Sequence, residues 1–238
     1  RNPKKGLYYM GVHIQSNFNV VADKDIYFNG DGNRWLKVDD NAKFYILNSN
    51  NENDAYHNES GSIMVGNNSV LYINGSAYNN EDYSSGSKGE VNIGSNSVVY
   101  VNGNLTVKGG GRLTVAKGAV LVVNGQLDCS VIRAAEGSTI YCKSLTNGRS
   151  DGITLGNFYC DGNVFSYGMT VFSSQDNPAN VFIGGNYVTN STDNAITIQD
   201  YGKVIIKGSA NCGDISVNSN GGLYCDGSIT TKSLTNKT

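Results

Sequence analysis

The chain contains little proline, tryptophan, histidine or charge: its 238 residues include 2 Pro, 1 Trp and 2 His, and 16% are charged. A formal net charge of −2 gives no electrostatic reason to expect nucleic acid or an anionic membrane as a partner. No run of about 18 apolar residues is present, so we expect no membrane insertion. Helical spacing with caps is also missing, which predicts a low helix content.

Glycine is abundant instead, with 30 residues, and a short apolar strand ending in Asn-Gly recurs along the chain. The clearest copies are Val-Leu-Tyr-Ile-Asn-Gly at 70–75, Val-Val-Tyr-Val-Asn-Gly at 98–103 and Val-Leu-Val-Val-Asn-Gly at 120–125. Weaker copies occupy 25–30, 44–49, 139–144, 157–162, 180–185, 203–208 and 222–227. A repeat of roughly 18 to 28 residues is typical of a solenoid.

Within each copy, the positions four and two before the closing residue are apolar. Because alternate residues of a strand point to opposite faces, these pairs should face one interior. In this phase the interior pairs include Ile26 with Phe28, Tyr45 with Leu47, and Leu71 with Ile73. Further short strands follow the turns, which predicts an all-β parallel β-helix of about ten coils, right-handed, at ~4.8 Å per coil. The alternative, a β-sandwich, predicts hairpins and no common phase between distant strands.

Segments that depart from the repeat suggest the domain organisation. We expect an N-terminal cap at 1–23, the β-helix at 24–234 and a disordered tail at 235–238. The polar stretches 48–60 and 76–88 should project as loops. The chain opens at Arg1 without a signal peptide and reads as a fragment excised from a larger protein.

The five cysteines follow the same phase and form no Cys-x-x-Cys motif. They are Cys129, Cys142, Cys160, Cys212 and Cys225, all at predicted inward positions. Buried thiols of the core are the main interpretation. One disulfide between the equivalent Cys142 and Cys160 is an alternative, and a zinc site is a third, although it lacks nearby histidines.

The asparagine before each turn also has a structural explanation. Asn29, Asn74, Asn102 and Asn124 stand in this position. Asparagine tolerates the left-handed conformation of tight turns, and stacked side-chain amides can form hydrogen-bonded ladders.

Catalytic groups do not converge in this pattern, so we expect no enzymatic activity, no cofactor and no metal. Glycoside hydrolysis needs two carboxylates within about 5 to 9.5 Å. Asp161 and Asp226 share one phase but lie three coils apart, roughly 14 Å. The neighbours Asp39 and Asp40 should point to opposite faces, and no acidic calcium cluster accompanies Arg112, Arg133 or Arg149.

Two further polar groups have plain interpretations. His13 falls in the predicted cap and His57 in a predicted loop, so both are expected to be solvated surface residues. Thr106 and Thr114 belong to no regular outward row of threonines, which argues against binding to ice.

The position three before the closing residue lies between the two inward residues and should point outward. Seven of its ten members are aromatic. In full the row is Tyr27, Ile46, Tyr72, Tyr100, Val122, Tyr141, Tyr159, Phe182, Ile205 and Tyr224. Apolar patches of this size mark binding surfaces, and aromatic rings suit the C–H faces of sugars while tyrosine hydroxyls stay solvated. Structural stacking beneath a cover and a protein–protein interface are the alternatives.

The rod with Asn-Gly turns, polar insertions and an aromatic face resembles secreted bacterial β-helix adhesins. Among these it is most similar to the C-terminal domain of tapirins, surface proteins that attach cellulolytic bacteria to plant-biomass cellulose. The resemblance implies a non-catalytic, extracellular, cell-surface domain that binds cellulose or a related plant cell-wall polysaccharide. A polysaccharide lyase or hydrolase, and a structural stalk that self-associates through the tyrosine face, are the competing hypotheses.

Overall fold

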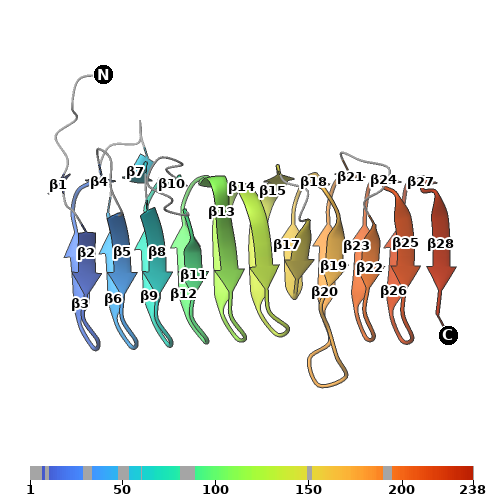
Figure 1. Cartoon of the computed structure of the whole chain (residues 1–238), viewed down its shortest axis with the longest axis horizontal. Helices are drawn as coiled ribbons and strands as arrows, with labels where there is room; N and C mark the ends of the chain where they lie inside the picture. Colours follow the sequence, from blue (N-terminus) through green and yellow to red (C-terminus); the bar gives the residue numbers. More distant parts are fainter. Residues whose placement is uncertain are drawn as a thin grey trace.

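The computed structural model describes residues 7–8, 11–28, 34–47, 54–59, 61–80, 89–148, 152–189 and 195–237. These residues form an all-β rod in which the paired strands run parallel, and they contain no helix. Figure 1 shows the strands side by side along the rod, from the N-terminal end in blue to the C-terminal end in red. The structure is a β-solenoid of about nine turns, which confirms the predicted parallel β-helix.

Each turn of the rod contributes to three parallel sheets. Sheet 1 contains β1 (Leu7–Tyr8), β4 (Ile26–Phe28), β7 (Asp54–Asn58), β10 (Ser76–Asn79), β18 (Val164–Ser166), β21 (Tyr187–Thr189), β24 (Ala210–Asn211) and β27 (Ile229–Thr230). Sheet 2 contains β2 (Gly11–Ile14), β5 (Arg34–Val38), β8 (Gly61–Val65), β11 (Val91–Ile93), β16 (Ile153–Leu155), β19 (Met169–Val171), β22 (Ile196–Ile198), β25 (Asp214–Val217) and β28 (Ser233–Asn236). Sheet 3 contains β3 (Asn19–Ala22), β6 (Lys43–Ile46), β9 (Val70–Ile73), β12 (Val98–Val101), β17 (Asn157–Cys160), β20 (Asn180–Ile183), β23 (Lys203–Ile206) and β26 (Gly222–Cys225).

Three longer strands in the middle of the rod pass from one sheet to the next. They are β13 (Leu105–Val115), β14 (Val120–Ala134) and β15 (Thr139–Asn147). Their pairing register shifts where the chain changes sheet, for example between Val107 and Arg112 of β13. The same three-sheet arrangement therefore continues through the middle of the rod without interruption.

Alternation along each short strand produces the core. In β9, Leu71 and Ile73 are buried while Tyr72 between them is half-buried and outward. The same pattern recurs in β14 and in β17, where Phe158 and Cys160 are 0% exposed. Stacking these inward side chains from coil to coil removes their apolar surface from water, which is the main stabilising contribution.

Most turns between sheets 2 and 3 contain one residue in the left-handed backbone conformation. Its backbone φ is positive at Asn17, Asn41, Asn68, Asn96, Tyr201 and Asn220, and at Gly118 and Gly137 in the equivalent position. Asparagine was predicted to serve this role, but at a different turn. Asn74, Asn102 and Asn124 do not have positive φ. Asn29 lies outside the described residues.

The predicted cap at 1–23 is wrong over most of the described part of this segment. β2 and β3 pair in register with β5 and β6, so residues 11–22 form the first coil of the rod. The predicted disordered tail 235–238 also begins too early, because Thr235 and Asn236 pair with Ser216 and Val217. Both segments contain few strongly apolar pairs, so the repeat is weak in their sequence.

The predicted loops 48–60 and 76–88 each contain a strand of sheet 1. β7 and β10 occupy 54–58 and 76–79 and pair with each other. Their polar composition is misleading because Asn58 and Asn79 point inward and are buried. The Asn79 side-chain amide donates to the carbonyl of Gly61 at 3.2 Å, which offsets part of the cost of burying it, while its Oδ1 has no hydrogen-bond partner among the described residues. Residues 48–53, 60 and 81–88 lie outside the described residues.

All five cysteines are free thiols, and all except half-buried Cys225 are buried. Core thiols were therefore the correct interpretation, and Cys142 and Cys160 pair in register without a disulfide. Burial raises the pKa of Cys129 to about 12. A thiol with so high a pKa carries almost no thiolate near neutral pH and is chemically inert.

Candidate functional site

One outward position of sheet 3 carries a continuous row of large apolar side chains. Register pairing places them on successive coils, in the order Val21, Tyr45, Tyr72, Tyr100, Val122, Tyr141, Tyr159, Phe182, Ile205 and Tyr224. We call its seven aromatic members, from Tyr45 to Tyr224, the aromatic column. Six of the seven aromatic residues predicted for this face belong to it.

The rings of the column stack along the rod. Ring centroids are 5.3 Å apart between Tyr72 and Tyr100, with planes inclined by 12°. Tyr141 and Tyr159 are 4.9 Å apart at 13°, and Tyr45 is tilted by 43° against Tyr72. Stacked neighbours cover one another's faces partly. Even so, Tyr141 is 43% and Tyr224 59% exposed, so the column presents aromatic surface to solvent.

Tyr27 is the one predicted member that the structure places elsewhere. It lies in β4 of sheet 1, where its ring stacks on His57 at 5.5 Å. The first coil of the row carries Val21 instead. On the second coil the outward residue is Tyr45, which was predicted to be inward, whereas Ile46, predicted to be outward, is fully buried. The repeat at 44–49 was read one residue out of phase. Aligning Lys43-Phe44-Tyr45-Ile46 with Val70-Leu71-Tyr72-Ile73 would have shown the correct phase.

Two flanking rows complete the middle of this face. On one side Val70, Val98 and Val120 are outward and in register, and Val98 is 38% exposed. On the other side a ladder of amides runs parallel to the column. Asn102 donates to Asn74 at 3.0 Å and Asn124 donates to Asn102 at 3.1 Å. The predicted asparagine ladder is thus present, and the central amide keeps an N–H and an acceptor site for a ligand.

Charged residues replace the amides toward the C-terminal end of the same row. Lys207 Nζ lies 2.6 Å from Asp226 Oδ2. Hydrogen bonds from Lys207 and then from Tyr224 lower the pKa of Asp226. Asp161 is three coils from Asp226, as their in-register cysteine neighbours show. These two carboxylates do not converge in the way that glycoside hydrolysis requires.

His57 is neither solvated nor in a loop, contrary to expectation. It is outward in β7 of sheet 1, with its side chain 17% exposed. The ring lies between Tyr27 and Tyr78, with the Tyr78 centroid 4.7 Å away. Its nitrogens contact Asp54 at 2.9 Å and Glu59 at 2.7 Å. Burial lowers the pKa of His57, but the hydrogen bonds to Asp54 and Glu59 outweigh it and raise the pKa overall.

This arrangement predicts a stability that depends on pH. Because the folded pKa of His57 is raised above its ordinary 6.5, its protonated form stabilises the fold fully below that pH. The contribution is lost as the pH rises through the folded pKa. We expect the unfolding free energy of the parent to exceed that of His57→Gln most at acidic pH, with the difference shrinking as pH increases. Denaturant titrations across a pH series measure it, and a constant difference would contradict this role.

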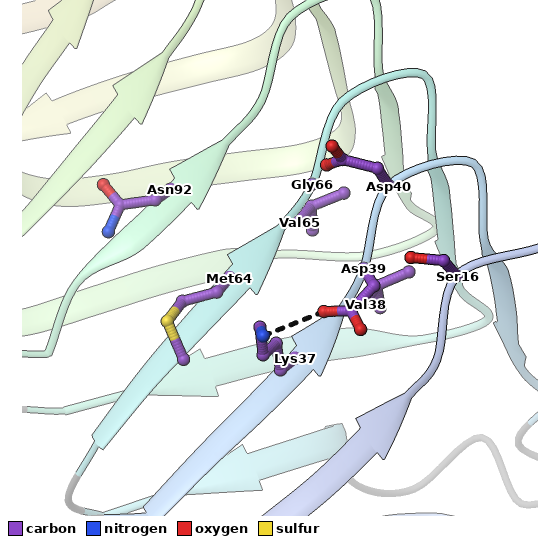
Figure 2. A pocket seen from close by; sticks show the side chains of 9 residues that line it. All are labelled: Ser16, Lys37, Val38, Asp39, Asp40, Met64, Val65, Gly66 and Asn92. Atoms are coloured by element: carbon purple, nitrogen blue, oxygen red, sulfur yellow. Dashed lines mark ion pairs between the residues drawn. The ribbon is translucent and has the colours of Figure 1, made fainter.

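An open depression of about 390 Å³ lies at the N-terminal end of the corner between sheets 2 and 3 (Figure 2). We call it the N-terminal pocket. Its lining includes Lys37, Asp39, Asp40, Met64 and Asn92. His13, predicted in the cap, stands beside it on β2, its ring edge-on to Trp35.

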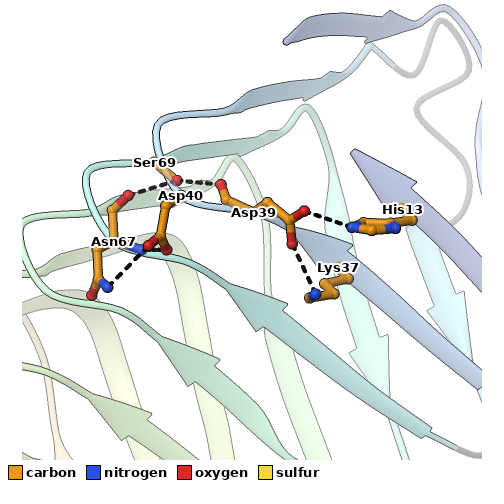
Figure 3. Close-up of polar contacts among 6 residues, drawn as sticks. All are labelled: His13, Lys37, Asp39, Asp40, Asn67 and Ser69. Atoms are coloured by element: carbon orange, nitrogen blue, oxygen red, sulfur yellow. Dashed lines mark hydrogen bonds and ion pairs between the residues drawn. The ribbon is translucent and has the colours of Figure 1, made fainter. Parts of the chain in front are cut away.

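The carboxylates of this pocket are already engaged within the chain (Figure 3). Asp39 contacts Lys37 at 2.9 Å and His13 at 2.7 Å, and hydrogen bonds from Lys37 and then His13 lower its pKa. Asp40 accepts the backbone N–H of Asn67 at 2.6 Å. The contacts of Asp39 with His13 and of Asp40 with Asn67 join successive coils, so the acidic pair has a structural role in the turns.

Sheet 2 carries a row of hydroxyl groups that was not anticipated. In five successive coils the outward residue is Thr154, Thr170, Thr197, Ser216 and Thr235, each in register with the next. We call this row the hydroxyl column. It begins after Arg133, which separates it from Thr114. Thr114 is therefore outside the row, as expected, and Thr106 pairs with Tyr78 and Asp128 in sheet 1. The row itself could not be predicted, because the register across unequal coils cannot be counted from one strand.

Comparison of the chain with known protein families, with curated proteins and with solved structures finds no match. Within the described ranges, no group of three or more His, Cys, Asp or Glu side chains is placed to hold a metal ion. A helix able to cross a membrane is likewise not found among these residues.

Proposed function

We propose that this chain is a non-catalytic polysaccharide-binding domain that uses the aromatic column of sheet 3. The observation that carries the proposal is the register of seven aromatic side chains on one face of a rigid parallel β-helix. The repeat of ~4.8 Å along the rod suits a long, flat polymer of repeating units. Cellulose or a related insoluble plant polysaccharide is the ligand we propose.

The chemistry of the face supports a sugar ligand over a charged one. Aromatic rings and the valine row pack against the C–H faces of pyranose rings, while tyrosine hydroxyls stay in water. The amides of Asn74, Asn102 and Asn124 line one edge and can exchange hydrogen bonds with sugar hydroxyls. Each contact is weak, but many on one rigid body add through avidity.

Attachment of a cell surface to plant biomass follows from this binding mode. A domain that holds an insoluble polymer without cleaving it serves adhesion, which is the role that the resemblance to tapirin C-terminal domains implies. We accordingly propose an extracellular, cell-surface location in a bacterium. Self-association through the same face is the competing use of the column.

Retention on microcrystalline cellulose is the direct test of the proposal. We expect the chain to sediment with cellulose and to be displaced by soluble cello-oligosaccharides. The same preparation is run by size-exclusion chromatography over a range of concentrations. Absence of retention would contradict cellulose as the ligand, and concentration-dependent assembly without retention would favour self-association.

A second candidate function, binding to ice, is favoured by the hydroxyl column. Hydroxyl and methyl groups repeating at ~4.8 Å on a rigid sheet can hold water molecules in a regular array. Inhibition of ice recrystallisation is the measurement, with Thr170→Tyr and Thr197→Tyr as the disrupting changes. We expect inhibition by the parent and its loss in this variant; no inhibition by the parent would exclude the role.

A further inference from the structure

A second pocket, of about 260 Å³, lies near the C-terminal end of the corner between sheets 2 and 3. Three successive coils build it, through the connections that follow β19, β22 and β25. Ser173 and Gln175 come from the first, Gln199, Asp200 and Tyr201 from the second, and Asn218 from the third. We call it the C-terminal pocket. The connection after β19 extends beyond the other turns of the rod and forms one wall (Figure 1).

Hydrogen bonds to Glu136 hold the wall in place. Ser174 Oγ donates to Glu136 Oε1 at 2.7 Å, and Asn177 Nδ2 donates to the same oxygen at 2.6 Å. Ser174 and Asn177 also exchange backbone hydrogen bonds of 3.1 and 3.2 Å. The pocket is therefore pre-formed, which lowers the entropic cost of binding.

Two polar atoms of this lining are buried without a partner. Ser173 is only 7% exposed, and neither its Oγ nor Asn218 Oδ1 has a hydrogen-bond partner within the described chain. A buried polar atom left unpaired is destabilising and calls for an explanation. The N-terminal pocket, at the same corner of the rod, differs because its carboxylates are already paired within the chain.

Tyr201 is the second unusual element. It occupies the left-handed turn position, with φ of 64°, that Asn or Gly fills in the other coils where φ is positive. A bulky aromatic residue is disfavoured in this conformation. Tyr201 nevertheless occupies this position and lines the pocket beside the unpaired polar atoms, and such unfavourable backbone conformations cluster at ligand sites.

We propose that the C-terminal pocket binds one sugar residue of a neutral carbohydrate. Hydroxyl, amide and carboxylate groups of Ser173, Gln199, Asp200 and Asn218 offer both donors and acceptors, and the Tyr201 ring offers a stacking surface. Among the described residues of its lining there is no lysine or arginine, so an anionic ligand is disfavoured. The inference rests on the proposed function for its ligand class, but not on the aromatic column.

The pocket also lies close to the column along the chain. Tyr201 precedes β23, whose outward Ile205 is in register with Phe182 and Tyr224. A polysaccharide that lies on sheet 3 could therefore place a chain end or a side branch in the pocket. Such a site would add selectivity to a face that otherwise recognises any flat glycan.

The test uses the full chain labelled with ¹⁵N and titrated with cellobiose and, separately, xylobiose. We expect amide shifts at 173–175, 199–202 and 218 with at least one disaccharide, in addition to any shifts along the aromatic column. Ser173→Ala should raise Kd at least tenfold while raising the midpoint of denaturation, because it removes an unpaired buried hydroxyl. Tyr201→Asn should behave in the same way, because asparagine is the residue used at the equivalent turns.

Several outcomes would overturn the inference. A fall in stability of Ser173→Ala would show that its hydroxyl is structural. Shifts only along the aromatic column would exclude the pocket while supporting the proposed function. No shifts with either disaccharide would also exclude it, and cellulose retention would then report on the column alone.

Discussion

Replacing Tyr100, Tyr141 and Tyr159 by alanine is expected to weaken binding to cellulose by about 10- to 1000-fold. Loss of an aromatic contact costs about 0.5–1.5 kcal/mol, and three such losses add to roughly 1.5–4.5 kcal/mol. The three residues belong to the aromatic column and lie on successive or nearby coils. Depletion isotherms with microcrystalline cellulose measure the change in affinity.

A matched control variant distinguishes binding by sheet 3 from binding by any exposed aromatic side chain. Phe165 is an outward aromatic residue of sheet 1 and is 37% exposed, comparable with the residues of the column. Phe165→Ala should bind cellulose as the parent does. Equal retention of the parent and the triple variant on cellulose would show that sheet 3 is not the binding face, even though cellulose is bound.

Phe158→Ala is expected to destabilise the fold by about 3–5 kcal/mol, as for other buried aromatic residues truncated to alanine. Phe158 is 0% exposed and stacks between Ile140 and Val181 of the adjacent coils. Because each coil contacts only its neighbours, the cavity weakens both interfaces at once. Chemical denaturation followed by circular dichroism measures the loss.

For Tyr159, the next residue of the same strand, we expect a small loss of stability and a clear loss of binding. Tyr159→Ala removes one outward stacking partner and should cost only about 1 kcal/mol of stability while weakening binding. Phe158→Ala, assayed at a temperature where it remains folded, should bind cellulose as the parent does. A large stability loss for Tyr159→Ala would show that the column is a structural element, as its stacked geometry also permits.

Much of the architecture could be predicted from the sequence because its signals are local. Alternation in Val70–Ile73 and Val98–Val101 sorts inward from outward side chains within a single strand. Six aromatic members of the column follow directly from this alternation. Alternation of apolar residues does not reveal a polar residue that points inward, such as Asn58, and it gives the wrong face where the phase of one copy is mistaken, as at Tyr45.

Other parts of the surface could not be predicted because they depend on contacts between coils. The hydroxyl column joins Thr154, Thr170 and Thr197, whose separations along the chain are unequal. The C-terminal pocket joins Ser173 with Asn218 across three coils. His57 is likewise covered by the rings of Tyr27 and Tyr78 from neighbouring strands, so its local polar context pointed wrongly to a solvated loop.

The sequence by itself determined that this chain is a parallel β-helix with a buried apolar interior, because strand alternation and turn residues act over a few positions. Only the tertiary structure decided which outward residues share a sheet, since coil lengths vary and the phase of each coil is set by pairing with its neighbours. For that reason Tyr27 lies in sheet 1 and not in the aromatic column, and sheet 2 carries a row of hydroxyl groups.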